Sequence, residues 1–287
     1  MPLRLLVVEG NVRAAREAHA SSYGLTPAES YASVLHGIEP AVVCDIALPA
    51  DEGANLPDPS GLEGYDGVVL TGSALHIYED QPAVRRQVEL MRAVYASGTP
   101  AFGSCWGIQV GAVAAGGDVR RNPRGREIGF AREIVPSEAG RAHPLLAGRP
   151  RAYTAPAIHL DTVLTAPPGA TVLASNAMSD VQAAEIGHEG GLFWGVQYHP
   201  EFDLAEVAAI LGRMPEVLVG EGFCPSLEAV FEHVADLRAL HADPGRTDLA
   251  WRFGLDAQVL DPALRLTEIR NFLEHRVKPH RSARGRE

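Results

Sequence analysis

The sequence predicts an α/β protein with a doubly wound, mostly parallel sheet, followed by a C-terminal helical extension. Apolar segments with the length of buried strands recur along the N-terminal part of the chain, at 3–8, 41–46, 67–72 and 101–102. Continuous apolar strands are typical of a parallel sheet that is covered on both faces. Helical patterns separate several of these strands, which favours right-handed crossover connections.

The helices of this part have recognisable signals. We expect residues 11–37 to form a loop and then a helix, which Thr26 and Pro27 would cap and begin. A loop follows the second strand, since residues 49–64 are rich in Pro, Gly and Asp. An amphipathic helix is predicted at 82–97. Another helix should run from about 106 to 115 and end at a glycine pair.

From Glu127 to Gln197 the pattern changes to short strands with turns and no clear helix. These strands are predicted at 128–135, 151–154, 171–174, 181–186 and 192–197. We expect them to form a mixed, partly antiparallel edge of the same sheet. Asp203 then caps a helix through Gly212, and Glu206 three residues later fits a capping box.

The pattern divides the chain into a domain at 1–213 and a helical extension at 214–287. One helix of the extension is marked by Leu227, Val230, Phe231, Val234 and Leu237. Asp261 and Pro262 begin another, which runs to about His275. We expect the extension to pack on the core or to form the contact of a homodimer. The basic last ten residues or so are expected to be disordered.

The composition excludes several classes of protein. A net charge of −11 and a pI near 5.5 argue against binding to duplex nucleic acid. No apolar run approaches the roughly 18 to 20 residues that span a bilayer, and the N-terminus does not resemble a signal peptide. The three cysteines have no disulfide or zinc-site spacing. We therefore expect a cytoplasmic protein without a metal or another cofactor.

Cys105 is the candidate nucleophile. Residues 103–107 read Gly-Ser-Cys-Trp-Gly directly after an apolar strand, and flanking glycines permit a strained strand-to-helix turn. The thiol would then sit at the first turn of a helix, where free N–H groups favour a thiolate. The alternative is a buried structural cysteine, the usual fate of a single cysteine in a cytosolic protein.

His199 and Glu201 are the candidate base and its orienting carboxylate. Both follow the apolar strand at 192–197, and Pro200 between them favours an extended backbone. A nucleophile, a base and a carboxylate at the ends of strands are the components of a covalent acyl-transfer site. The alternative for His199 is a His-Pro turn on the surface.

Other residues are candidates for binding the substrate or its oxyanion. Gly72 and Ser73 follow the third strand, and their backbone N–H groups could form an oxyanion hole with the N–H of Trp106. An ordinary turn explains this segment almost as well. Gln109 lies one helical turn after Cys105 and could hold the amino-acid end of a substrate; a solvent-facing glutamine is the alternative.

These motifs resemble those of the class I (triad) glutamine amidotransferases, and the chain is most similar to standalone domains like the glutaminase half of GMP synthase. The matching segments are 68–73, 78–82, 103–109, 157–161, 179–183 and 193–201. The resemblance covers roughly residues 1–213 and implies a flavodoxin-like fold with a Cys–His–Glu triad. It also implies that His159 and Tyr198 lie on the substrate side.

The resemblance implies hydrolysis of the glutamine side-chain amide to glutamate and ammonia through a γ-glutamyl thioester on Cys105. Residues 214–287 contain no phosphate-binding loop, so an ammonia acceptor would belong to a synthetase partner protein or be absent. Two alternatives remain open: hydrolysis of another γ-glutamyl amide or amine conjugate by the same triad, and a regulatory binding protein that is inactive alone. Ser73, Trp106 and Ile108 depart from the usual family residues at their positions.

Overall fold

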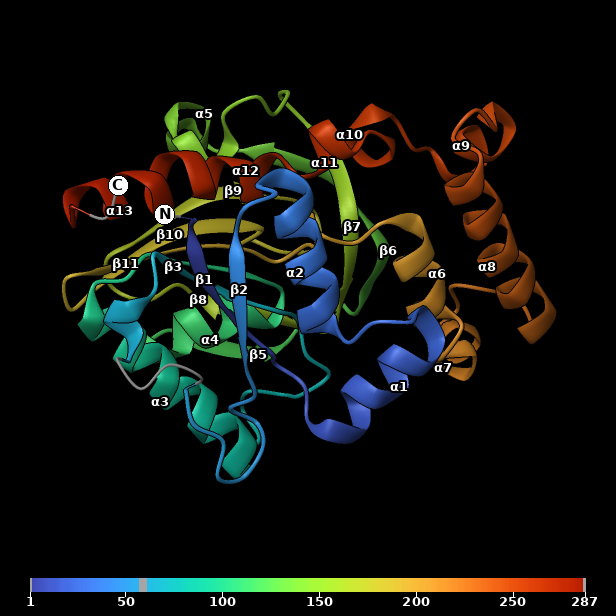
Figure 1. The fold of residues 1–287 in the computed structure, drawn as a ribbon. Coiled ribbons are helices and arrows are strands. Elements are labelled where there is room, and N and C mark those ends of the chain that lie inside the picture. Colours follow the sequence, from blue (N-terminus) through green and yellow to red (C-terminus); the bar gives the residue numbers. More distant parts are fainter. Residues whose placement is uncertain (1, 57–60, 286–287) are drawn as a thin grey trace.

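A nine-stranded sheet forms the centre of the computed structural model, which describes residues 2–56 and 61–285 (Figure 1). Its strands lie in the order β2 (Val43–Ala47), β1 (Arg4–Val8), β3 (Gly67–Leu70), β4 (Ala101–Ser104), β11 (Gly191–Val196), β10 (Ala183–His188), β9 (Ala170–Ser175), β6 (Glu127–Pro136) and β7 (Tyr153–His159). A separate two-stranded sheet consists of β5 (Asp118–Arg121) and β8 (Asp161–Thr165).

Helices precede, connect and follow these strands. In chain order the α-helices are α1 (Arg13–Tyr23), α2 (Pro27–Ile38), α3 (Pro82–Ser97), α4 (Trp106–Ala114), α5 (Glu138–Ala142), α6 (Leu204–Leu211), α7 (Pro215–Gly220), α8 (Leu227–Ala242), α9 (Thr247–Phe253), α10 (Ala257–Leu260), α11 (Pro262–Arg265), α12 (Thr267–Phe272) and α13 (Lys278–Ala283). The 3-10 turns η1 (Leu62–Gly64) and η2 (Pro144–Leu146) and the π-helical segment η3 (Leu273–Val277) complete the described elements.

The sheet is mixed, which corrects the expectation that it is mostly parallel. Parallel pairs join β2 to β1, β1 to β3, β3 to β4 and β4 to β11. Antiparallel pairs join β11 to β10, β10 to β9, β9 to β6 and β6 to β7. The antiparallel part therefore makes up half of the pairings and is more than an edge. The α/β class with C-terminal helices is confirmed.

Both faces of the parallel half are covered, because alternate strand residues feed two apolar cores. Leu5 points into the core that contains α2 and the helical segment α12–η3, and Leu6 points into the core that contains α3 and α4. Figure 1 shows these helices on opposite sides of the strands. The carboxyl ends of β3, β4 and β11 consequently lie together at one edge, as parallel neighbours must.

Several elements differ from the expectations. Residues 11–37 contain two helices, since α1 forms where a loop was expected, while Thr26 and Glu29 cap α2 with a full capping box. β5, α5 and β8 were not predicted. Asp203 caps α6 by accepting the N–H of Glu206, but the carboxylate of Glu206 accepts from Ser30 instead of returning to Asp203.

The C-terminal extension packs on the core at two places. α12 and η3 bring Phe272 against Phe102 of β4, with ring centroids 5.6 Å apart. α7, α8 and α9 form a third apolar cluster with α6. Of the last ten residues, Lys278–Ala283 form α13 and Arg284 donates to the carbonyl of Glu63, while residues 286–287 lie outside the described residues. Disorder of this end of the chain stays a prediction. The domain boundary at 213 stays a prediction.

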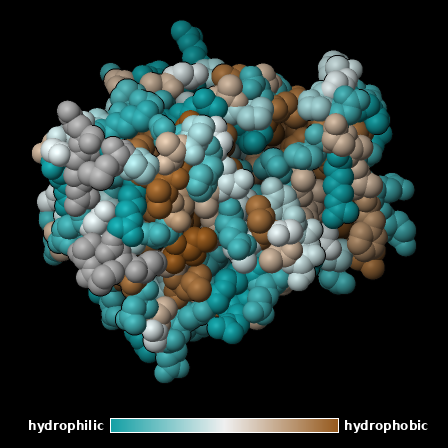
Figure 2. Space-filling view, viewed as in Figure 1, coloured by the Kyte–Doolittle hydropathy of each residue, from teal (hydrophilic) through white to brown (hydrophobic). Residues whose placement is uncertain are grey.

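Apolar side chains also reach the surface. Figure 2 shows hydrophobic residues gathered over the edge strand β2. Four of the exposed large apolar residues belong to the extension, namely Phe223, Leu227, Phe231 and Trp251. A homodimer that uses the extension stays a prediction. In the described ranges, no helix combines the length and the apolar character needed to cross a membrane.

Candidate active site

Cys105 lies in the tight turn between β4 and α4 that its flanking glycines predict. Its φ of 53° and ψ of −101° are strained for a residue that carries a Cβ. A Cβ on Gly103 would lie 2.7 Å from Cα of Gly107, so glycine is needed where the two arms of the turn approach. The N–H of Cys105 donates to the carbonyl of Val196 at 2.8 Å, which ties the turn to the end of β11.

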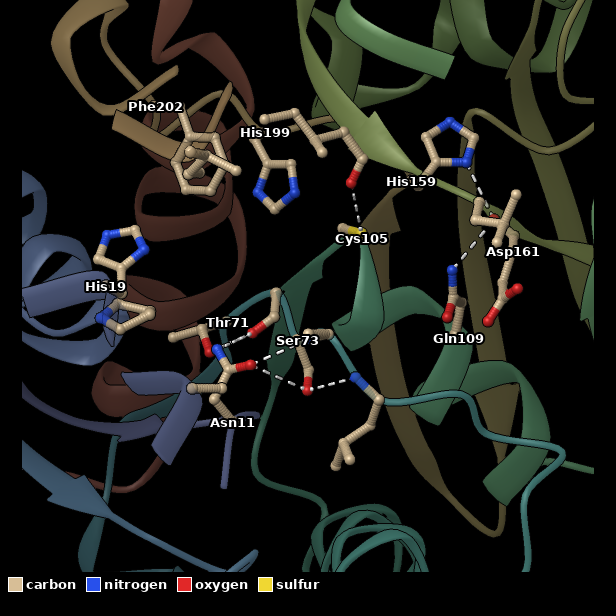
Figure 3. A pocket seen from close by; sticks show the side chains of 18 of the residues that line it. Asn11, His19, Thr71, Ser73, Cys105, Gln109, His159, Asp161, His199 and Phe202 are labelled. Carbon is tan, nitrogen blue, oxygen red and sulfur yellow. Dashed lines mark hydrogen bonds between the residues drawn. The ribbon is translucent and has the colours of Figure 1, made fainter. Parts of the chain in front are cut away.

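The structure brings the three predicted catalytic residues together. Nδ1 of His199 lies 2.7 Å from Oε1 of Glu201, and both side chains are almost fully buried. The Cys105 sulfur is near enough to the His199 imidazole to raise the pKa of that imidazole. The Cys105 thiol also faces the carbonyl of Ile158, with 3.7 Å between sulfur and oxygen. Figure 3 shows Cys105 and His199 in the same pocket.

A second set of hydrogen bonds holds the carboxylate. Oγ of Ser104 donates to Oε2 of Glu201 at 2.8 Å, and the hydroxyl of Tyr31 lies 3.3 Å from Oγ of Ser104. Both contacts are buried. The other oxygen of Glu201 is thus left to hold Nδ1 of His199, and this contact fixes the orientation of the ring, with Nε2 on the sulfur side.

The charge on His199 is set by its neighbours. Burial would lower the pKa of His199, but the charges of Glu201 and Cys105 and hydrogen bonds to both outweigh burial and raise it from 6.5 to about 10. The imidazole is therefore protonated at neutral pH in the free protein. A protonated imidazole beside the sulfur favours a thiolate and can donate a proton to a leaving amine.

The loop after β3 faces His199, as expected for an oxyanion segment. In the described part of the chain, the N–H of Gly72 and the N–H of Trp106 have no acceptor. Asn11 holds the loop in place, since its Oδ1 accepts from the N–H of Ala74 at 3.0 Å and from Oγ of Ser73 at 3.4 Å. Two free N–H groups beside a nucleophile can stabilise an oxyanion.

Gln109 and His159 lie at the other side of Cys105 (Figure 3). Nε2 of Gln109 donates to the carbonyl of Asp161 at 3.2 Å, so the glutamine is buried rather than solvent-facing. His159 places Nδ1 2.9 Å from the same carbonyl and Nε2 2.8 Å from the carboxylate of Glu127. Since both ring nitrogens have partners, His159 shapes this wall and is not available as a base.

Two predicted site residues point elsewhere. The indole of Trp106 is buried in the core and donates to Oε1 of Gln87 at 2.7 Å, so only its backbone faces the pocket. The hydroxyl of Tyr198 lies 2.7 Å from that of Tyr153 and donates to Glu268 at 2.8 Å. Tyr198 precedes His199 at the strand end, and consecutive side chains point to opposite faces. A substrate contact by Tyr198 is therefore contradicted by its orientation.

The triad opens into a pocket with a volume of about 280 Å³. Sequence reasoning did not find several of its lining residues: Asn11, His19, His76, Phe202, Arg213 and Met214. The ring of Phe202 stacks on that of His199, with centroids 3.9 Å apart and planes 5° apart. Phe202 had a local signal, because it follows the triad glutamate directly. The others come from helices and loops without a motif.

The fold and the site define an α/β protein with the Cys–His–Glu arrangement of cysteine-dependent acyl-transfer enzymes. More particularly, the chain belongs to the glutamine amidotransferase class-I family, whose model matches residues 41–211. A γ-glutamyl-L-1-hydroxyisopropylamide hydrolase from a Pseudomonas species is 37% identical over 283 residues, which cover 96% of this chain and 94% of that protein.

One further relative matches part of the sequence, and another matches the fold. A glutamine-hydrolysing GMP synthase from Leifsonia xyli is 36% identical over 67% of this chain and 37% of its own length. A crystal structure of a glutamine amidotransferase from Thermotoga maritima aligns with 97% of this chain and 99% of its own, with a TM-score of 0.65 and 19% identity. At this identity the crystal structure shows a shared fold alone.

Proposed function

We propose that this chain hydrolyses γ-glutamyl amides of small amines through a γ-glutamyl thioester on Cys105. The observation that carries the proposal is the alignment with a γ-glutamyl amide hydrolase over 96% of the chain, which must include most of residues 214–287. The alignment with the GMP synthase covers 67% of the chain. The arrangement of Cys105, His199 and Glu201 supports the cysteine chemistry.

The first half of the proposed reaction forms the thioester. The Cys105 sulfur attacks the γ-carbonyl carbon, and the N–H groups of Gly72 and Trp106 stabilise the oxyanion, each by about 3 kcal/mol. The C–N bond then breaks while His199 gives its proton to the leaving amine. Glu201 keeps the imidazole oriented throughout.

The second half releases glutamate. His199, now neutral, takes a proton from water, whose oxygen attacks the thioester carbon. The C–S bond breaks and releases the Cys105 thiolate, while the proton taken from water stays on His199, so the imidazolium and thiolate of the free enzyme are restored. One water is consumed, and one glutamate and one amine are released.

The pocket wall beyond Cys105 suits the α-carbon end of a γ-glutamyl group. Asp161 contributes a carboxylate, which lies 2.7 Å from Nδ1 of His76, and Gln109 contributes an amide. Arg126 also lines the pocket, and its Nε donates to Glu221 at 2.9 Å. We propose that this polar wall binds the α-ammonium and α-carboxylate groups of the substrate.

The test compares a γ-glutamyl alkylamide with glutamine as substrates of the purified chain. We expect amine release from the alkylamide with a higher kcat/KM than ammonia release from glutamine, and no release from either by Cys105→Ala. Trapping of a γ-glutamyl adduct on Cys105 by mass spectrometry would identify the intermediate. Retention of hydrolysis by Cys105→Ala would contradict the mechanism.

Glutamine hydrolysis with transfer of ammonia to a synthetase partner is the second candidate, and the resemblance to GMP synthase favours it. A higher kcat/KM for glutamine, or glutamine hydrolysis that begins only when a partner protein is added, would support this candidate instead. Absence of both activities and of covalent labelling by a glutamine-analogue electrophile would favour a regulatory binding protein.

A further inference from the structure

The position of His199 determines where the leaving amine must lie. His199 has to reach the nitrogen of the scissile bond to protonate it, so this bond points from Cys105 toward His199 and the acyl chain points away. Figure 3 shows His199, Phe202 and His19 on one side of Cys105, and His159, Asp161 and Gln109 on the other. The pocket therefore continues past His199 on the side opposite the polar wall.

This continuation, which we name the amine lobe, is lined by Ala15, His19, Phe202, Ile210, Arg213 and Met214. Ala15 and His19 are one helical turn apart on α1, and the last three lie at and just after the end of α6. Ammonia, the leaving group of glutamine, would fill little of this space. The apolar side chains at Phe202, Ile210 and Met214 suit a carbon skeleton.

Arg213 gives the lobe a positive charge. Its Nη2 lies 3.3 Å from Nδ1 of His19, and no carboxylate of the described residues forms an ion pair with it. The carboxylate behind His19 belongs to Glu206, which lies 3.1 Å from Nε2 of His19 and accepts from Ser30 at 2.8 Å. Because Glu206 is occupied by these contacts, a charged group in the lobe would meet chiefly the guanidinium.

We propose that the amine lobe is the subsite for the leaving amine, and that it selects small amines whose carbon skeleton packs on Phe202, Ile210 and Met214 and which carry no second positive charge. The inference rests on the proposed function and adds the chemical class of the leaving group. In this proposal α1 limits the size of the leaving amine, and Arg213 limits its charge.

The first experiment fills the lobe. Ala15→Leu adds bulk where Ala15 faces the pocket, and Ala14→Leu places the same side chain on the exposed side of α1. For Ala15→Leu we expect kcat/KM for γ-glutamyl isopropylamide to fall roughly tenfold relative to that for glutamine. Ala14→Leu should keep the ratio of the wild type. Met214→Phe, which adds bulk at a lobe residue that follows α6, should repeat the selective loss.

The second experiment reverses the charge. γ-Glutamyl propylamide and γ-glutamyl 3-aminopropylamide differ in one ammonium group. We expect the wild type to favour the neutral amide about fivefold, and Arg213→Glu to shift this ratio about tenfold toward the cationic amide. Arg92→Glu, an equal change of charge at an exposed position of α3, should leave the ratio as it is.

The outcomes separate the two proposals. If no γ-glutamyl amide is hydrolysed, the proposed function itself fails. If the amides are hydrolysed through Cys105 but Ala15→Leu and Met214→Phe lower both substrates equally, the lobe is not the amine subsite. If the ratio of neutral to cationic amide is the same in the wild type and in Arg213→Glu, the charge selection by Arg213 is refuted.

Discussion

Replacement of Gly72 by alanine should disable His199 without removing any catalytic group. A Cβ at this position would lie 2.6 Å from Cε1, 3.4 Å from Nε2 and 3.6 Å from Nδ1 of the imidazole. Carbon atoms in contact are about 3.5 Å apart, so the imidazole must move by about 1 Å. After this movement the imidazole can no longer keep its 2.7 Å contact with Glu201 and face the sulfur of Cys105 at the same time.

A displacement of this size costs roughly a hundredfold in rate, or about 2.7 kcal/mol of transition-state stabilisation. The assay is kcat/KM for a γ-glutamyl amide, together with the rate at which iodoacetamide alkylates Cys105, since both depend on the imidazole. Gly37→Ala is the control, because a Cβ there has nothing within 4 Å and α2 should gain up to about 1 kcal/mol of stability. Gly72→Ala activity within threefold of the wild type would refute the reasoning.

Three further predictions follow from buried contacts, two in the triad and one in the core. The pKa of His199 is raised to about 10, so the imidazolium form and the stability it contributes are complete below about pH 6.5 and are lost as pH rises through about 10. A fall of kcat/KM near that pH is expected in the pH–rate profile. Glu201→Gln removes a charge that raises the pKa of His199, so burial should lower this pKa and move the fall to lower pH. An unmoved profile would show that the fall does not come from His199. Ser104→Ala removes a buried donor to Glu201 and should lower kcat about tenfold in a steady-state assay with little change in Tm, whereas an unchanged kcat would mean that the bond is dispensable. Glu268→Gln leaves the fully buried guanidinium of Arg149 without its charge partner and should lower the free energy of unfolding by about 3–5 kcal/mol in urea titrations; a loss below 1 kcal/mol would contradict the buried ion pair.

The triad was predictable because its signals are local. The glycines around Cys105 and the strand before His199 each define a short piece of backbone whose geometry follows from the residues themselves. Parallel pairing of β4 with β11 then brings the two strand ends together. Two motifs at the ends of neighbouring parallel strands therefore predicted a site.

Other parts of the molecule lacked such signals. α1 buries the polar residues Arg16 and His19, and its sequence lacks the large apolar residues that mark the buried side of a helix. The antiparallel share of the sheet depends on which strands pair, and pairing is a long-range property that strand patterns leave open. The prediction for Tyr198 was wrong for another reason. A family motif identifies the residue type at this position, but the alternation of side chains at the strand end decides which face of the sheet Tyr198 points to.

The triad and the amine lobe are built from different elements, and this separation has a consequence for specificity. Cys105 and His199 are fixed by strand ends and backbone hydrogen bonds, whereas Ala15 lies on α1 and Arg213 follows the end of α6. Changes on α1 or after α6 can therefore alter the accepted amine while the sulfur and the imidazole stay in place. Phe202 belongs to both sets, because its ring stacks on His199 and also lines the lobe. A substitution at Phe202 should consequently change the rate for every substrate as well as the preference among them, and this double effect separates it from Ala15 and Arg213.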